Sequence, residues 1–239
     1  MCELKHSTKN TGSVAKPECC NHCEIDEAHF FKEYNKQFKS KLGKEQKKLL
    51  STVFRCMKDY YKKEKRSCDL NQMAYVLATM KHETGDFIDL YEGGYGRDRN
   101  KDGLDDYFDK YDPVLAKRNI DKKNAKSNGN LKKGDGYKYR GRGLVHLTWK
   151  NNYKKAGKML GVDLVNNPDL AAEPCNATKI ALWGMEGGRF TGARLSRFIN
   201  KNKVDYLEAR RVINGEDQRD KIAGYAKKLR KTLKMVAPC

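Results

Sequence analysis

The chain has 239 residues, enough for one substantial domain with a short appendage, and 50 Lys and Arg against 31 Asp and Glu give a formal net charge of +19. Such a basic chain favours a polyanionic partner, for example nucleic acid, an anionic cell surface or anionic lipid. It has no apolar run near the ~18 residues of a membrane span, and its N-terminus lacks the apolar core of a secretory signal. We therefore expect a monomer that is made in the cytoplasm without a signal peptide or transmembrane segment.

Cysteines are concentrated near the N-terminus, where residues 1–24 are polar and predict a Cys-rich tail. Cys20 and Cys23 have the C-x-x-C spacing of a zinc clasp or redox pair, with Cys19 and His22 beside them. No second pair with matching spacing follows. Three states therefore stay open: disulfides that tie the tail to the body, reduced thiols, or a metal site, which has the least support. We expect no cofactor.

Two amphipathic helices come next in the chain. The first begins at Asp26, carries aromatic residues on one side and is expected to end at Gly43; the second covers about residues 44–62, with apolar residues inward and lysines outward. They predict a helical N-terminal extension over residues 25–68 that packs on a body formed by residues 69–239.

A third helix is predicted from its cap at Asp69 to Glu83. Apolar residues recur on one face at i, i+3, i+4 and i+7, so this face should lie in a core. Glu83 follows on the same face. A carboxylate that points inward loses solvation, which favours the protonated form that a general acid needs. The alternatives are a surface acid or one partner of a structural ion pair. The apolar residues are Met73, Val76, Leu77 and Met80.

The stretch from Asp86 to about Arg142 has little helical periodicity and predicts a long loop with a small sheet, interrupted by a short helix near residues 113–119. So long an irregular stretch inside a compact domain is usually functional. Thr148 is expected to cap a helix that ends at Gly161. The fold class should therefore be mainly α, or α+β with a small β element. Further helices are predicted at about 175–187, 203–213 and 216–235.

Residues from about 69 to 235 resemble the catalytic domain of glycoside hydrolase family 19, the chitinase-like group that also includes peptidoglycan-cleaving phage endolysins. The resemblance rests on four blocks in the correct order. It implies a lysozyme-like or chitinase-like helical domain whose small β element lines the cleft. The blocks are 82–85 (HETG), 139–148 (YRGRGLVHLT) followed by Asn152 and Tyr153, 166–171 (NNPDLA) and 211–215 (RVING).

The resemblance implies that Glu83 is the general acid of an inverting mechanism, in which a second carboxylate activates water. The shorter endolysin-like members place that base nine residues later, which selects Glu92. Thr148 matches the hydroxyl residue that helps to hold the water. A solvated loop acid is the alternative for Glu92, and its rivals as base are Asp86, Asp89 and Asp98.

The resemblance also implies substrate contacts. Asn152 and Asn214 match amides that bind the acetamido group, although a surface amide and a turn residue are their alternatives. His146 departs from the usual glutamine. Arg219 resembles the arginine that pairs with the catalytic carboxylate. The complete predicted substrate-binding set is His82, Tyr139, His146, Asn152, Tyr153, Asn214 and Arg219.

Peptidoglycan and chitin share a β-1,4-linked N-acetylhexosamine backbone, so the family does not choose between them. The net charge favours an anionic bacterial wall or outer membrane over neutral chitin. We therefore expect an endolysin or lysozyme-like enzyme that cleaves between N-acetylmuramic acid and N-acetylglucosamine after holin release or injection by a secretion apparatus. The alternatives are a chitinase and, in a different class, a glycan-binding or nucleic-acid-binding protein without activity. No motif for specific nucleic-acid recognition supports the last.

Overall fold

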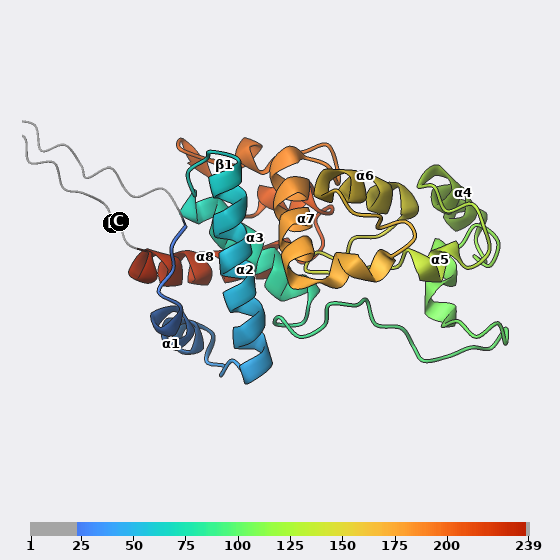
Figure 1. Ribbon diagram of the computed structural model, residues 1–239, viewed down its shortest axis with the longest axis horizontal. Coiled ribbons are helices and arrows are strands. Elements are labelled where there is room, and N and C mark those ends of the chain that lie inside the picture. Colours follow the sequence, from blue (N-terminus) through green and yellow to red (C-terminus); the bar gives the residue numbers. More distant parts are fainter. Residues whose placement is uncertain (1–22, 238–239) are drawn as a thin grey trace, which may run out of the picture.

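The computed structural model describes residues 23–237, and most of its ordered elements are helices (Figure 1). This confirms the predicted mainly helical class. None of the helices described in that range is long and apolar enough to cross a membrane. The α-helices are α1 Glu27–Phe38, α2 Lys44–Lys63, α3 Leu70–Glu83, α4 Asn119–Ser127, α5 Asp135–Lys138, α6 Lys150–Leu160, α7 Pro174–Gly187 and α8 Arg219–Val236. The 3-10 helices are η1 Asp106–Tyr111, η2 Pro168–Ala172, η3 Leu195–Arg197 and η4 Glu208–Val212, and the strands are β1 Ile199–Asn200 and β2 Lys203–Val204.

Helix α3 lies at the centre of the fold, packed mainly against α8 and also against α7. Its first turn is capped as expected, because the Asp69 carboxylate accepts hydrogen bonds from the backbone N–H groups of Asn71 and Gln72. All nine residues from Met73 to Lys81 are buried, so the helix is enclosed on every side rather than along the single face that the periodicity suggested. This burial fixes the end of the helix, where Glu83 lies.

The extension formed by α1 and α2 packs on the same core. Helix α1 lies against α8 and α2 lies against α7, at the end of the molecule opposite α4 and α5 (Figure 1). Aromatic rings fill the contact between them: the Phe30 and Phe54 rings meet edge to face at 4.8 Å. The left-handed residue Lys39 ends α1 before Gly43, which instead forms the N-cap of α2.

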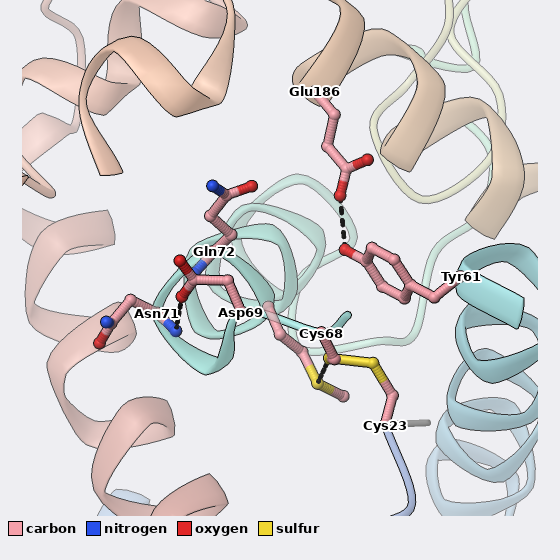
Figure 2. The surroundings of a disulfide bond; sticks show 8 residues. Cys23, Tyr61, Cys68, Asp69, Asn71, Gln72 and Glu186 are labelled. Atoms are coloured by element: carbon pink, nitrogen blue, oxygen red, sulfur yellow. Dashed lines mark hydrogen bonds between the residues drawn. A yellow bond between two sulfur atoms is a disulfide. The ribbon is translucent and has the colours of Figure 1, made fainter. Parts of the chain in front are cut away.

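Two disulfides join the extension to the body. Cys23 pairs with Cys68, directly before the Asp69 cap of α3, and Cys68 also contacts the Met73 sulfur at 3.7 Å (Figure 2). The second disulfide joins Cys56 of α2 to Cys175 of α7. Cys23 is therefore no thiolate metal ligand. Cys19, Cys20 and His22, the other weak metal candidates, lie outside the described residues.

Two elements differ from the sequence prediction. The prediction of a short helix near residues 113–119 is wrong, since α4 begins only at Asn119. The helix expected over 203–213 is also wrong, because the Asn200 side chain accepts hydrogen bonds from the N–H groups of Asn202 and Lys203 and so closes a β1–β2 hairpin, which η4 follows. A local polar side chain thus offers the backbone a turn in place of a helix.

The small sheet is also not where it was expected. Its two strands lie at 199–204, whereas the expected place was the long loop beside the cleft. In that loop only isolated bridges occur, from Tyr91 to Arg142 and from Arg142 to Leu147. The β element therefore does not line the cleft as a sheet.

We predict that the double substitution Cys56→Ser/Cys175→Ser lowers the free energy of unfolding by about 2–5 kcal/mol, because the disulfide closes a long loop in the unfolded chain. Guanidinium unfolding under oxidising conditions measures this. Wild-type protein with reductant should show a loss at least as large, since both disulfides then open. Equal unfolding free energies for the variant and the oxidised wild type would contradict the prediction.

Candidate active site

A cleft of about 430 Å³ brings together the end of α3, the loop after it and the segment that leads into α6. Its lining combines two carboxylates with amides, a hydroxyl, an imidazole and aromatic rings. The lining residues are Glu83, Glu92, Tyr111, Asn128, Val145, His146, Leu147, Thr148, Trp149, Asn152, Phe190, Ile213 and Asn214.

Glu83 is the last residue of α3 and is held by a buried arginine. Arg210 Nη1 donates to Glu83 Oε1 at 3.0 Å, and the Arg210 side chain is only 4% exposed, against 20% for Glu83. Arg210 Nε also donates to the Asp217 carbonyl at 3.0 Å, so the guanidinium is fixed on two sides. The ion pair therefore aims the carboxylate into the cleft.

Glu92 lies on the loop after α3 and is held mainly by neutral donors. Tyr111 OH donates to Oε1 at 2.9 Å and the Gly141 backbone N–H donates to Oε2 at 3.0 Å, while Lys110 Nζ lies 3.6 Å from Oε1. Burial and the Glu92 charge raise the pKa of Tyr111, so its hydroxyl stays protonated and available as a donor. Both oxygens of Glu92 are thus fixed by the protein.

Gly141 approaches Glu92 more closely than any other residue type could. A Cβ atom at Gly141 would lie 2.9 Å from Glu92 Oε2 and 2.9 Å from the Cβ of His146. The missing side chain lets the Gly141 backbone exchange two hydrogen bonds with Glu92, since its carbonyl also accepts from Glu92 N at 2.9 Å. The glycine of the YRGRG block therefore positions the second carboxylate.

Four further predicted site residues lie on the cleft wall. Thr148 Oγ1 donates to the His146 carbonyl at 2.9 Å, and Asn152 Nδ2 donates to the Thr148 carbonyl at 3.0 Å, which leaves the Asn152 amide oxygen free to accept. Asn214 Oδ1 accepts from the Gly215 N–H at 2.8 Å, and its amide nitrogen can still donate. His146 Nε2 lies 3.3 Å from the Asp89 carbonyl. Thr148 does not cap α6, because Trp149, with φ +79°, occupies the N-cap position.

Besides Arg219, three predicted substrate contacts lie away from the cleft lining. Tyr139 and Tyr153 are fully buried, and their hydroxyls donate to the carbonyls of Val165 and Arg140. They support the wall from behind, so the prediction that they bind substrate is wrong. His82 also does not line the cleft, and burial lowers its pKa.

The predicted pairing of Arg219 with the catalytic carboxylate is also wrong. Arg219 lies at the start of α8 and faces Glu208, Glu216 and Asp220 at 3.6–3.9 Å. Arg210 holds Glu83 instead. It stands one position before the RVING block, so the arginine pair 210–211 was the available signal.

None of the rival bases lines the cleft. Asp86 instead binds Lys81 Nζ at 2.5 Å and accepts a hydrogen bond from Tyr34, while Asp98 accepts the backbone N–H groups of Asp102 and Gly103. Tyr111 was not expected in the site. The sequence gives little signal for this role, because Tyr111 reaches Glu92 from a separate 3-10 helix, η1. The Tyr111 ring packs edge to face on the Trp149 ring, with the centroids 5.0 Å apart.

Comparisons with known proteins identify the domain that contains the two carboxylates. Residues 70–188 match the sequence profile of chitinase class I, the glycoside hydrolase family 19 domain. This chain carries a family 19 domain. The family 19 match includes Glu83, Glu92 and Thr148 and ends before Arg210 and Asn214.

A family 19 domain-containing protein of Haemophilus influenzae is 38% identical over 132 residues, which cover 50% of this chain and 64% of that protein. Endochitinase A2 of Pisum sativum is 49% identical over 49 residues, 20% of this chain and 15% of that protein. The chain thus matches less than two thirds of either relative. Chitinase C of Streptomyces griseus HUT6037 has the same family 19 fold, with a TM-score of 0.58 at 21% identity over 91% of this chain and 95% of that one.

We predict that Arg210→Lys lowers kcat by about 10- to 100-fold, because an ammonium cannot reach both Glu83 and the Asp217 carbonyl and a hydrogen bond to a charged group contributes about 1.5–3 kcal/mol. Arg219→Lys is the matched control and should keep nearly full kcat. Initial rates on a soluble oligosaccharide and thermal melts of both variants measure this. A larger loss of kcat in Arg219→Lys than in Arg210→Lys would reverse the assignment.

We predict that Gly141→Ala lowers kcat by up to ~10²-fold, because the added methyl displaces Glu92 and a small misplacement of a reacting group has effects of this size. Gly224→Ala is the control, since a Cβ there meets no atom within 4 Å. If Gly141→Ala keeps the wild-type kcat, the position of Glu92 is not important for the reaction.

Proposed function

We propose that this chain is an inverting glycoside hydrolase that cleaves β-1,4-linked N-acetylhexosamine polymers, with Glu83 as general acid and Glu92 as general base. The observation that carries the proposal is that the two carboxylates line one cleft and are both held by partners from other segments of the chain. Their partners differ, since Glu83 is bound by a guanidinium, whereas Glu92 accepts from a hydroxyl and a backbone N–H and has an ammonium farther away, at 3.6 Å.

In this mechanism Glu83 protonates the glycosidic oxygen while Glu92 removes a proton from water on the other side of the sugar ring. An inverting enzyme needs about 6.5–9.5 Å between the carboxyl groups to leave room for that water. Thr148, on the same wall, can hydrogen-bond the water. The free amide groups of Asn152 and Asn214 suit the carbonyl and N–H of an acetamido substituent.

Chitin is the substrate that the relatives favour. The matching family is described as chitinase class I, and the similar plant and Streptomyces proteins are named as chitinases. The cleft itself has no requirement for a charged substrate, because Arg210 is already paired with Glu83.

Peptidoglycan is the second candidate, and the net charge of +19 supports it. A strongly basic protein is attracted to an anionic wall or outer membrane through long-range electrostatics, whereas chitin is neutral. For this candidate we propose a monomeric lysozyme-like enzyme that cleaves after N-acetylmuramic acid and reaches the wall through a holin or a secretion apparatus.

A parallel assay distinguishes the two substrates. Wild type and Glu83→Gln are incubated with purified peptidoglycan and with colloidal chitin, and the products are identified by mass spectrometry. Soluble chito-oligosaccharides without wall clearing would make it a chitinase. Wall clearing with new reducing ends and intact peptide stems would make it a muramidase. Failure of wild type on both would remove the enzymatic proposal and favour a glycan-binding protein.

We predict that Glu83→Gln and Glu92→Gln each lower kcat by ~10²–10⁴-fold, the usual contribution of general acid or base catalysis. Glutamine can still accept from Arg210 or Tyr111, so the fold should be kept, as circular dichroism and thermal melts will show. Asp89→Asn is the control because Asp89 lies on the same loop outside the cleft lining. A wild-type rate for Glu92→Gln would exclude it as the base.

A further inference from the structure

The loop of residues 98–109 has the spacing of a twelve-residue calcium-binding loop. Such loops take oxygen ligands from positions 1, 3, 5, 7, 9 and 12, use the backbone carbonyl at position 7, and have glycine at position 6. One departure is the aspartate at position 12, where glutamate is usual. The side chains at positions 1, 3, 5, 9 and 12 are Asp98, Asn100, Asp102, Asp106 and Asp109, and Gly103 occupies position 6.

The backbone already curls around the first three of these side chains. Asp98 accepts the N–H groups of Asp102 and Gly103 at 3.0 and 2.8 Å, and Asn100 accepts that of Asp102 at 3.1 Å. Gly103 has φ +80°, a conformation that suits glycine and gives the sharp turn required at position 6. The helix η1 then begins at Asp106, as the helix after a calcium loop does.

Asp102 supplies an observation that is independent of the spacing. Its Oδ2 is buried from solvent and accepts no hydrogen bond, while its side chain is 12% exposed and Oδ1 accepts the N–H of Leu104. The Lys133 ammonium lies 3.4 Å from Oδ2. Within residues 23–237 this ammonium is the only ion-pair or hydrogen-bond partner of the buried oxygen, so an atom suited to a cation ligand is available here for a divalent ion that displaces the lysine.

Two ion pairs hold acidic side chains of the loop in this structure. Asp106 is turned to Arg99 Nε at 2.6 Å and Asp102 faces Lys133, and within residues 23–237 no three acidic, histidine or cysteine side chains already converge as a metal site. Both basic partners are more than half exposed. The two basic side chains can therefore move into solvent, which leaves the largely buried Asp102 and Asp106 carboxylates to a divalent ion.

We propose that residues 98–109 bind one Ca²⁺ ion through the side chains at positions 1, 3, 5, 9 and 12 and the carbonyl of Leu104. Ca²⁺ suits a flexible set of six or seven oxygens, whereas Mg²⁺ demands a strict octahedron. Binding rotates Asp106 away from Arg99 and replaces Lys133 at Asp102.

The position of the loop gives the ion a consequence for the cleft. Helix η1 starts within the calcium loop and ends at Tyr111, whose hydroxyl holds Glu92. On its other side the loop is joined to residues 96 and 97, because Asp105 accepts the Gly96 N–H and the Arg97 carbonyl accepts the Asp106 N–H, both at 2.7 Å. An ordered calcium loop therefore steadies the helix that positions the proposed base.

Isothermal titration of EGTA-stripped, dialysed full-length protein with CaCl₂ tests the proposal. We expect one Ca²⁺ per chain with a Kd at or below ~10⁻³ M, the weak end for calcium modules, and at least tenfold weaker binding of Mg²⁺. Saturating Ca²⁺ should raise Tm by several degrees and slow amide hydrogen exchange in residues 106–111. The absence of saturable heat and of a Tm shift up to 10 mM CaCl₂ would overturn the proposal.

Variants identify the ligands. Asp102→Asn should weaken Ca²⁺ binding at least tenfold, and so should Asp109→Asn, whose carboxylate takes no part in the hydrogen bonds that shape the loop and whose loss should leave the fold intact. Asp163→Asn is the matched control, because Asp163 accepts backbone N–H groups in a similar turn elsewhere. Wild-type affinity in both loop variants would place the ion elsewhere and refute this site.

Discussion

The burial of α3 on all sides is the constraint on which the candidate site depends. The helix packs mainly against α8, with smaller contacts to β1 and α7, and all nine of its residues from Met73 to Lys81 are buried. Its last residue, Glu83, therefore points to one place, where the almost fully buried Arg210 fixes the carboxylate. Removal of one partner of such a pair leaves an uncompensated buried charge, so the pair ties the reacting group to the stability of the core.

The second carboxylate is positioned in a different way. Glu92 lies on an irregular loop, and its geometry comes from Tyr111 and Gly141, which belong to separate segments of the chain. A loop can hold a reacting group only where other segments provide such hydrogen bonds, because it lacks the internal ladder of a helix. The calcium loop proposed for residues 98–109 lies between Glu92 and Tyr111 and would stiffen this weaker half of the site.

The extension contributes to the same region. Tyr34 of α1 donates to the Asp86 carboxylate, and Gln46 of α2 donates to the Asp86 carbonyl at 2.6 Å. Both helices therefore bind the turn directly after Glu83. Asp86 has φ +74°, an unusual conformation for a residue other than glycine, which these contacts and Lys81 stabilise. The disulfides Cys23–Cys68 and Cys56–Cys175 keep the extension on the body.

The sequence by itself determined most of the helices and the motif that contains the acids. The Asp69 cap, the helix that ends at Glu83 and the left-handed Gly161 at the end of α6 follow from local signals, and the structure confirms them. The spacing of the 98–109 loop can also be read from the sequence. Local hydrogen bonds and hydrophobic periodicity act over a few residues, so they are visible without the fold.

Only the tertiary structure decided which side chains meet. Arg210 rather than Arg219 pairs with Glu83, although they lie 127 and 136 positions beyond it in the chain. Tyr139 and Tyr153 belong to a block that resembles family 19, yet both are buried, because packing and not the motif decides which side chains reach the cleft. Contacts between distant segments depend on how the helices pack around α3, and no local pattern in the sequence encodes which of these segments meet.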